Sequence, residues 1–215
     1  MRRMPVANPD NLPDPRESVT GLVLAGGLGR RMGGEDKGLV PLAGRPMVEH
    51  VLHSLRPQVG ALLINANRNR ERYAQYGYPV VADTLDGFLG PLAGVLSALP
   101  HVTSEFVATA PCDAPLVAPD LVRRLHAACV SQAADLAVAT DGERRQPVFL
   151  LLRTRVAPAL EAYLAGGGRK IDTWFDQVRV AEADFSDEPD TFVNVNDAGE
   201  RERVEARLLS RDRSR

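Results

Sequence analysis

Residues 19–37 of this chain read VTGLVLAGGLGRRMGGEDK, and the interpretation of every other segment depends on them. The first part is apolar and rich in β-formers, which predicts a buried strand over 19–25. Five glycines follow within nine residues: Gly26, Gly27, Gly29, Gly33 and Gly34. Because glycine has no Cβ, the backbone N–H groups of such a loop can approach an anion closely. Arg30, Arg31 and Lys37 add positive charge, so this strand and loop predict a site for a polyphosphate.

The spacing within the loop excludes two common phosphate-binding motifs. A P-loop needs a Gly-Lys pair followed by Ser or Thr, whereas Lys37 stands between Asp36 and Gly38. The dinucleotide fingerprint Gly-x-Gly-x-x-Gly would need a glycine where this chain has Met32. That fingerprint also expects Asp or Glu at the end of the second strand, where this chain has Asn65.

The composition favours a globular enzyme over several other classes of protein. The chain has 215 residues, 44% hydrophobic and 25% charged, which suits one α/β domain with a substantial core. A net charge of −2 provides no basic field for nucleic acid or an anionic membrane. Cys112 and Cys129 are too few for a disulfide framework and fit a reducing cytoplasm. No apolar run approaches the ~20 residues of a membrane span, and the start lacks the apolar core of a secretory signal, so we expect a cytoplasmic protein.

Apolar periodicity predicts strands and helices in alternation along the chain. Further strands are expected over 61–65, 79–82, 106–110, 136–139, 146–152 and 178–181, and residues 192–196 are expected to be extended. Helices are expected from Pro46, from Pro91, from Pro119, through Tyr73 and Tyr76, from Val156 to Gly166, around Ile171–Phe175, and after the cap Asp197. This alternation predicts an α/β fold, a Rossmann-like three-layer sandwich with a mostly parallel twisted sheet and helices on both faces.

The two ends of the chain are expected to lie outside this fold. Residues 1–18 are expected to be a disordered extension, because prolines among polar neighbours prevent a regular element. Residues 19–209 are expected to form a single domain, and the basic residues 210–215 a frayed tail.

Polar residues follow three of the predicted strands: Asn65, Asp83 and Asp113. Because ligands bind beyond the carboxyl ends of parallel strands, these residues and the glycine loop should share one rim. Asp113 lies between Pro111 and Pro115, which stiffen its turn. It is the first candidate ligand for Mg²⁺, a cation that takes one or two carboxylates besides phosphate oxygens and water. Asp83 is the second candidate, and it could either bind the metal or position a bound nucleotide.

The predicted rim suits nucleotidyl transfer. Arg31 and Lys37 would neutralise the phosphates and the departing pyrophosphate, at roughly 1.5–3 kcal/mol for each charge-assisted bond. In this reaction the terminal phosphate of an acceptor would attack the α-phosphate of a bound nucleotide in line. Because the attacking phosphate is already ionised at pH 7, no general base is needed. In agreement, the histidines are expected away from the rim: His50, His53, His101 and His126.

The pattern Leu-Ala-Gly-Gly-x-Gly-x-Arg-Met-Gly-Gly-x-Asp-Lys over 24–37 resembles the signature loop of nucleotidyltransferases. Its ending resembles the molybdenum cofactor guanylyltransferase family, and the resemblance extends over residues 19–209. In that family the nucleotide is GTP, the acceptor is molybdopterin or its molybdenum form, and the product is the guanine dinucleotide cofactor. The resemblance implies that GTP contacts Leu24, Ala25, Gly26, Gly27, Lys37, Asn65, Asp83 and Asp113. It also implies Mg²⁺ at Asp113 and the pterin acceptor near Asn194 and Asn196.

Several alternatives remain open at this stage. A related transferase could use CTP to make the cytosine dinucleotide, or could act on a sugar or an alcohol. A non-catalytic carrier of the nucleotide or of molybdopterin is the other class. The resemblance implies substrates of small-molecule type and transient contact with molybdopterin-delivering proteins and apo-molybdoenzymes. Residues 166–170 either end a helix or form a basic lip for the acceptor.

Some of the singled-out side chains also have structural interpretations. Asp113, Asp83 and Asn65 are all residue types that form ordinary turns. The cysteines, Trp174 and the pair Tyr73 and Tyr76 are expected to pack in the core rather than to react or to stack on a ligand.

Overall fold

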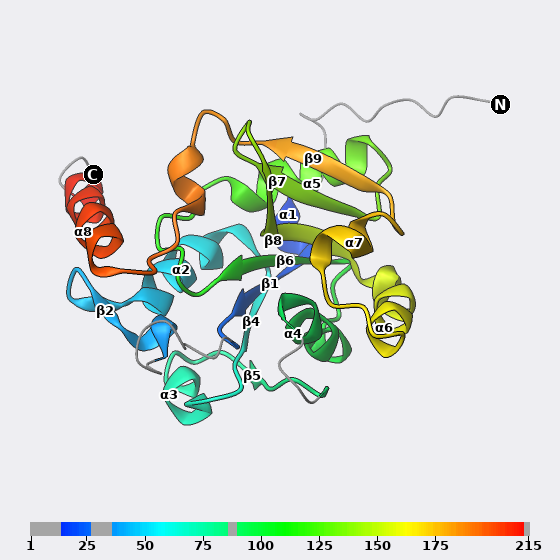
Figure 1. Ribbon diagram of the computed structural model, residues 1–215, viewed down its shortest axis with the longest axis horizontal. Coiled ribbons are helices and arrows are strands. Elements are labelled where there is room, and N and C mark those ends of the chain that lie inside the picture. The colour runs from blue at the N-terminus through cyan, green and yellow to red at the C-terminus, as the bar shows by residue number, and fades with distance from the viewer. Residues whose placement is uncertain (1–13, 27–35, 86–89, 213–215) are drawn as a thin grey trace.

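The computed structural model describes residues 14–26, 36–85 and 90–212, and a seven-stranded sheet lies at its centre (Figure 1). The strand order is β5-β4-β1-β6-β8-β7-β9. The strands are β1 Val19–Leu24, β4 Ala61–Asn65, β5 Val80–Val81, β6 Phe106–Pro111, β7 Leu136–Thr140, β8 Arg145–Arg153 and β9 Val180–Asp184. Neighbouring strands are parallel except that β8 is antiparallel to both β6 and β7. The mostly parallel sheet expected from the sequence is therefore confirmed.

Helices cover both faces of this sheet because the strands are apolar on both sides. One hydrophobic cluster holds Val23 of β1 and the buried faces of α2 (Met47–Leu55), α3 (Arg70–Ala74) and α5 (Leu121–Ser131). The other holds Leu22 and Leu24 of β1 and the buried faces of α4 (Pro91–Ala98), α6 (Ala157–Ala165) and α7 (Ile171–Phe175). Alternate residues of one strand thus enter opposite layers. This arrangement confirms the three-layer sandwich.

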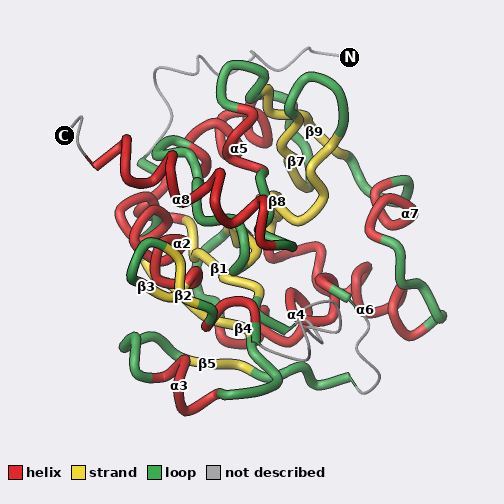
Figure 2. The backbone as a smooth tube through the Cα atoms, turned by 60° about the vertical axis from the view of Figure 1, so that its left-hand side comes forward, coloured by secondary structure: helices red, strands yellow, loops and turns green. Residues whose placement is uncertain are grey.

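A smaller cluster attaches the last helix, α8 (Ala198–Asp212), to the body of the protein. Val204 of α8 packs there with Leu42, Met47 and Leu116. A two-stranded hairpin lies under α8 and consists of β2 (Pro41–Leu42) and β3 (Arg45–Pro46). Figure 2 shows this hairpin beside α2, and it shows α3 next to the edge strand β5. The short helices are α1 Pro15–Ser18, η3 Lys37–Leu39, η4 Arg56–Gln58, η5 Leu99–His101, η6 Thr154–Val156 and η7 Pro189–Phe192.

The structure differs from the expected elements at several places. Residues 15–18 form α1 rather than a loose extension, because Pro15 fits the first helical turn and the Asp14 carboxylate accepts from the Arg16 amide at 2.9 Å. Pro46 precedes α2 instead of opening it, because its ψ of 142° is extended. Phe192 ends the 3₁₀ helix η7 rather than starting an extended segment. The last helix continues to Asp212, past the expected frayed start at residue 210.

The reversed strand β8 pairs with only the first part of β6. Its ladder with β6 ends at the pair Ala108 and Leu151, and beyond it the Thr109 hydroxyl donates to the Val148 carbonyl at 2.6 Å. Residues 193–197, which we call the strap, pass this part of the sheet. The Val195 N–H of the strap donates to the Asp113 carbonyl at 3.0 Å. The strap is therefore held against the carboxyl end of β6.

None of the helices within residues 14–26, 36–85 and 90–212 has the length and apolar character that a membrane span requires.

Candidate active site

The carboxyl ends of β1, β4 and β6 are joined by backbone hydrogen bonds that continue past the strands. Leu24 is opposite Asn65 on one side and Pro111 on the other. The Ala25 N–H donates to the Asn65 carbonyl at 2.8 Å, and the Cys112 N–H donates to the Leu24 carbonyl at 3.0 Å. The start of the glycine loop thus lies between the segments that carry Asn65 and Asp113.

Lys37 joins three segments that are distant in the sequence. Its Nζ donates to Asp113 Oδ2 at 3.2 Å and to Asn196 Oδ1 at 2.6 Å. The Lys37 and Asp113 side chains are 19% and 18% exposed, so the pair is sheltered but reachable. Asn196 is itself fixed, because its N–H donates to Glu200 Oε2 at 2.7 Å. The convergence of Lys37 and Asp113 at one rim, expected from topology, is what the structure shows.

The capping box expected at the start of α8 forms in a modified way. The Asp197 carboxylate accepts from the Glu200 N–H at 2.8 Å, as a cap should. The Glu200 carboxylate, however, accepts from Asn196 rather than from the cap residue itself. The helix start therefore fixes the residue whose amide binds Lys37.

A second polar network lies at the ends of β4 and β5. Asn65 Nδ2 donates to Asp83 Oδ1 at 2.8 Å, and Asn67 Nδ2 donates to Asp83 Oδ2 at 2.8 Å. The Asn67 side-chain oxygen accepts in return from the Asp83 N–H at 2.8 Å. A Cβ at Gly26 would lie 3.2 Å from the side chains of Asn65 and Asn67, so the glycine backbone passes directly over this network. Gly94 of α4 lies against the same network, because a Cβ added at this glycine would overlap Asn65 Oδ1.

Asn67 is a site residue that the sequence interpretation missed. The stretch Asn65-Ala66-Asn67 provides the signal, because alternate residues at the end of a strand share one side. Two of the expected residues, Gly27 and Arg31, lie outside the described residues.

The surroundings of the Asp113 carboxylate are compatible with a Mg²⁺ ion. Lys37 occupies only its Oδ2 atom. Across residues 14–26, 36–85 and 90–212, no group of three or more His, Cys, Asp or Glu side chains is arranged to hold a metal. A single carboxylate supplemented by phosphate oxygens and water is a donor set that Mg²⁺ accepts.

The thiol beside this carboxylate is not available for chemistry. Cys112 is buried, and its burial, followed by the nearby carboxylates of Asp113 and Asp36, raises the pKa of the thiol well above its ordinary value. The thiol therefore stays protonated at neutral pH, and it packs against Gly38. Cys129 is buried as well. The expected packing role of both cysteines is confirmed.

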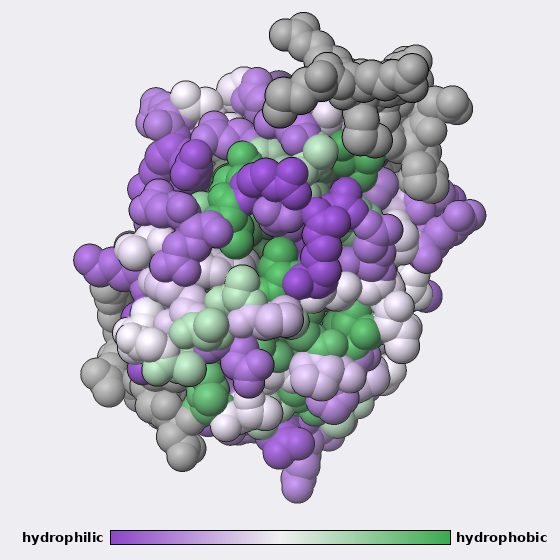
Figure 3. All heavy atoms as spheres, turned by 90° about the vertical axis from the view of Figure 1, so that its right-hand side faces the viewer, coloured by the Kyte–Doolittle hydropathy of each residue, from purple (hydrophilic) through white to green (hydrophobic). Residues whose placement is uncertain are grey.

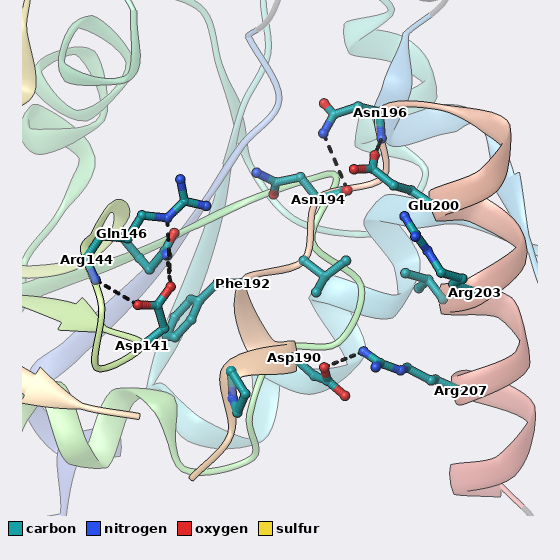
Figure 4. Close-up of a pocket in the computed structure, with 13 residues that line it drawn as sticks. Asp141, Arg144, Gln146, Asp190, Phe192, Asn194, Asn196, Glu200, Arg203 and Arg207 are labelled. Atoms are coloured by element: carbon teal, nitrogen blue, oxygen red, sulfur yellow. Dashed lines mark hydrogen bonds and ion pairs between the residues drawn. The ribbon is translucent and has the colours of Figure 1, made fainter. Parts of the chain in front are cut away.

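A cleft of about 510 Å³, which we call the α8 cleft, opens next to Asn196 (Figure 4). Its walls are the β7–β8 turn, η7 with the strap, and α8; the polar residues that line it are Asp141, Arg144, Gln146, Asp190, Asn194, Asn196, Glu200, Arg203 and Arg207. Arg207 pairs with Asp190, and Arg144 approaches Asp141 to 3.9 Å. The Arg203 side chain extends from α8 into the cleft, and no ion pair of Arg203 occurs within the described part of the chain.

Another groove, of about 600 Å³, has a different character. It lies between α4 and α6, and its lining is largely apolar, including Leu96, Leu99 and Leu164. Figure 3 shows the side of the molecule that carries α6 and α7, where apolar residues are visible between hydrophilic side chains. None of the predicted site residues lines this groove, so it plays no part in the candidate site.

The remaining expectations about side chains are mostly met. His126 is buried with its ring edge on Phe106, and burial lowers the pKa of its imidazole. His50 bonds the Leu42 carbonyl at 2.9 Å, so neither histidine reaches the rim. Trp174 and Tyr73 are fully buried in the core. Residues 166–168 end α6, and Arg169 donates to the Leu164 carbonyl at 2.9 Å, which supports the helix-end interpretation of that segment.

Comparison with known proteins places this geometry in a family context. Residues 21–180 match the family model described as the MobA-like NTP transferase domain. A molybdenum cofactor guanylyltransferase from Shewanella sp. (strain MR-4) is 48% identical over 190 residues, which is 88% of this chain and 96% of the relative. One from Shewanella sediminis (strain HAW-EB3) is 49% identical over 178 residues, 83% of this chain and 91% of the relative. The solved structure of molybdopterin-guanine dinucleotide biosynthesis protein A from Archaeoglobus fulgidus superimposes with a TM-score of 0.75 at 24% identity, covering 89% of this chain and 99% of that one.

Proposed function

Because this chain belongs to the MobA-like NTP transferase domain family, we propose that it transfers GMP from GTP to the terminal phosphate of molybdopterin. The products are the molybdopterin guanine dinucleotide and pyrophosphate. The names of its relatives support this choice of nucleotide and acceptor. The observation that carries the proposal is the position of Lys37, whose ammonium group touches both Asp113 and Asn196.

The nucleotide binds on the β1, β4 and β5 side of the rim in this proposal. The backbone around Gly26 faces the phosphates, while Asn65 and Asp83 face the nucleoside. The Asp83 carboxylate is oriented by two amide groups, so it can accept hydrogen bonds from a ligand without reorganising. Leu24, Ala25 and Gly27 complete the contact to GTP through the backbone.

Lys37 neutralises the triphosphate as charge moves to the leaving pyrophosphate. Its ammonium group has a flexible stem and carries three donors, so it can move from Asp113 to a phosphate oxygen. A charge-assisted bond of this kind contributes about 1.5–3 kcal/mol. We propose the same charge-neutralising role for Arg31 from the sequence pattern alone.

Asp113 would hold the Mg²⁺ that accompanies the nucleotide. When bound, this cation supplies charge neutralisation at the phosphates and makes pyrophosphate a better leaving group. The chain itself contributes the carboxylate, held at the end of β6 by the strap bond from Val195 to the Asp113 carbonyl. The Lys37 ammonium group bonds Asp113 Oδ2 and not Oδ1, so the Oδ1 atom can coordinate the metal.

The acceptor binds in the α8 cleft, with its phosphate near Asn196. Asn196 lines this cleft and also bonds Lys37, so it links the cleft to the nucleotide side. Asn194 lies on the same strap, and Arg203 offers a cation to an anionic acceptor. The nucleophilic phosphate is ionised at pH 7, which agrees with the placement of His50 and His126 away from the rim.

The reaction would take place in the cytoplasm, and two free, buried cysteines are compatible with that reducing environment. Transient contact with proteins that deliver molybdopterin and with apo-molybdoenzymes would bring in the acceptor and pass on the product.

The test is to mix the chain with Mg²⁺, molybdopterin and each of the four nucleoside triphosphates in turn, and to follow pyrophosphate. We expect release with GTP and much slower release with the others. Faster release with CTP would replace this proposal by the cytidylyl reaction. Binding of molybdopterin without pyrophosphate from any nucleotide would instead favour a carrier.

A further inference from the structure

The residue before Lys37 makes tertiary rather than local contacts. Asp36 Oδ1 accepts from the Tyr73 hydroxyl at 2.6 Å, and Asp36 Oδ2 accepts from Asn69 Nδ2 at 3.0 Å. Asp36 stands at the N-cap position of η3, yet its side chain makes no capping bond there. A carboxylate at this position would normally cap its own helix. Here it binds Tyr73 of α3 and Asn69, the N-cap residue of that helix, 37 and 33 residues further along.

The residue after Lys37 is fixed as well. A Cβ at Gly38 would lie 2.5 Å from the Tyr73 hydroxyl oxygen and 3.1 Å from the Cys112 sulfur, so only glycine lets this backbone come so close. The η3 turn is closed by bonds from the Leu39 N–H to the Asp36 carbonyl and from the Val40 N–H to the Lys37 carbonyl. The Cα of Lys37 is therefore held between two anchored neighbours.

The Tyr73 hydroxyl keeps its proton and donates it in the hydrogen bond to Asp36. Its side chain is fully buried in the core cluster beneath α2 and α5. Burial, together with the neighbouring Cys112 and Asp36, raises the pKa of its hydroxyl far above the ordinary value. Removing a hydroxyl from water costs free energy unless it is bonded, and the Asp36 carboxylate supplies that bond.

We propose that Asp36, Tyr73 and Asn69 form a latch that positions Lys37 for the triphosphate; this rests on the proposed function, in which Lys37 binds phosphate. A lysine side chain loses rotamer freedom when it binds a phosphate. Fixing its backbone beforehand reduces what remains to be ordered when the nucleotide arrives. The latch residues do not touch the nucleotide themselves, so they are positioning residues.

The first measurement compares the affinity for Mg²⁺–GTP and for guanosine in Tyr73→Phe, which keeps the ring and removes only the hydroxyl. We expect the dissociation constant for Mg²⁺–GTP to rise about 3- to 10-fold, with guanosine unchanged. Tyr76→Phe is the matched control, because Tyr76 lies just beyond the same helix and outside the latch; it should change neither constant. An equal loss for guanosine, or no loss for Mg²⁺–GTP, would overturn the latch.

A second variant guards against a folding defect in Tyr73→Phe. Asn69 is exposed and has a φ of 49°, so Asn69→Gly removes the amide group while keeping a residue that tolerates this backbone. We expect a smaller loss of the same kind, for Mg²⁺–GTP only. A loss that is equal for guanosine would contradict a positioning role.

The closing experiment combines Tyr73→Phe with Lys37→Ala. If the latch acts through Lys37, Tyr73→Phe causes no further loss of Mg²⁺–GTP affinity once the ammonium group is gone. The same loss in both backgrounds would overturn the latch but leave the proposed function intact. If Lys37→Ala alone leaves Mg²⁺–GTP affinity unchanged, the phosphate role of Lys37 fails, and the latch fails with it.

Discussion

Carboxylates lie at both ends of the strands in the central sheet. The amino ends, which we call the far edge, and the carboxyl ends, which we call the site edge, hold these carboxylates differently. At the amino ends of the strands, Asp135 accepts from Arg179 and from Arg155, and Glu105 pairs with Arg153. At the carboxyl ends, the Asp113 carboxylate meets one lysine, and the Asp83 carboxylate is held by two neutral amides. The far edge thus uses guanidinium groups, and the part of the site edge around Lys37 uses an ammonium group and amides.

We interpret this difference as a separation between charges that maintain the fold and charges that would serve a ligand. Hydrogen bonds from Arg179, opposed by burial and aided by Arg155, hold the pKa of Asp135 well below its usual range. A guanidinium group binds a carboxylate through several donors in a fixed geometry, so replacing that carboxylate by another anion breaks several bonds at once. The single ammonium group of Lys37 can release Asp113 when a phosphate arrives. We therefore expect the ligand to bind where an ammonium group, rather than a guanidinium group, meets the carboxylate.

The largest expected effect is on turnover, in Asp113→Asn. Loss of the carboxylate removes the metal ligand, so we expect pyrophosphate release with GTP to fall by at least about 100-fold. The thermal melting temperature should stay close to that of the unchanged chain, because the Asp113 side chain is not fully buried. Asp135→Asn makes the same chemical change at the far edge and should leave turnover intact. Retained turnover in Asp113→Asn would remove the metal from this position.

An intermediate effect is expected from Gly94→Ala, which tests the amide network. The new Cβ would overlap Asn65 Oδ1, and Asn65 is buried and orients Asp83. We expect a loss of about 1–3 kcal/mol in the free energy of unfolding and weaker binding of guanosine by calorimetry. Gly199→Ala is the control, since the nearest atom to its Cβ would be 3.4 Å away. Unchanged guanosine affinity in Gly94→Ala would place the nucleoside elsewhere.

The smallest effect is expected at the far edge, in Asp135→Asn. Arg179 and Arg155 are both more than half exposed, so water screens the pairs, and the free energy of unfolding at pH 7 should fall by only about 1 kcal/mol. Because the pKa of Asp135 is lowered in the folded state, this stabilisation is present above the unfolded pKa of about 4. It is lost as the pH falls toward the folded pKa.

Urea unfolding of both proteins at pH 7 and at pH 3 measures this dependence. The difference between them should shrink at pH 3. A constant difference, or a loss of turnover at pH 7, would contradict a purely structural role for the far edge.

The sequence predicts the parts of this molecule that depend on periodicity and topology. It predicts β4 with the observed bounds, 61–65, because an apolar run ends there at Asn65. The meeting of Lys37 and Asp113 follows from the rule that parallel strands share a carboxyl edge. Their roles in binding stay predictions.

Other features depend on side-chain pairs that leave no periodic signal. The bond from Tyr73 to Asp36 spans 37 residues, and tyrosine at that position is equally suited to simple packing. The reversed direction of β8 follows from a turn in which Asp141 accepts from the Glu143 and Arg144 amides at 2.9 Å. The alternation of elements predicts parallel strands, but it breaks here, because the expected strands 136–139 and 146–152 are joined by a connection too short for a parallel pair.

The most direct test of a single magnesium–triphosphate site is a crystal structure of the chain with GTP and Mg²⁺. We expect Lys37 Nζ to have left Asp113 for a phosphate oxygen, and the Asp113 carboxylate to coordinate the metal. A bound triphosphate elsewhere, with the 3.2 Å pair of Lys37 and Asp113 unchanged, would contradict the site described above.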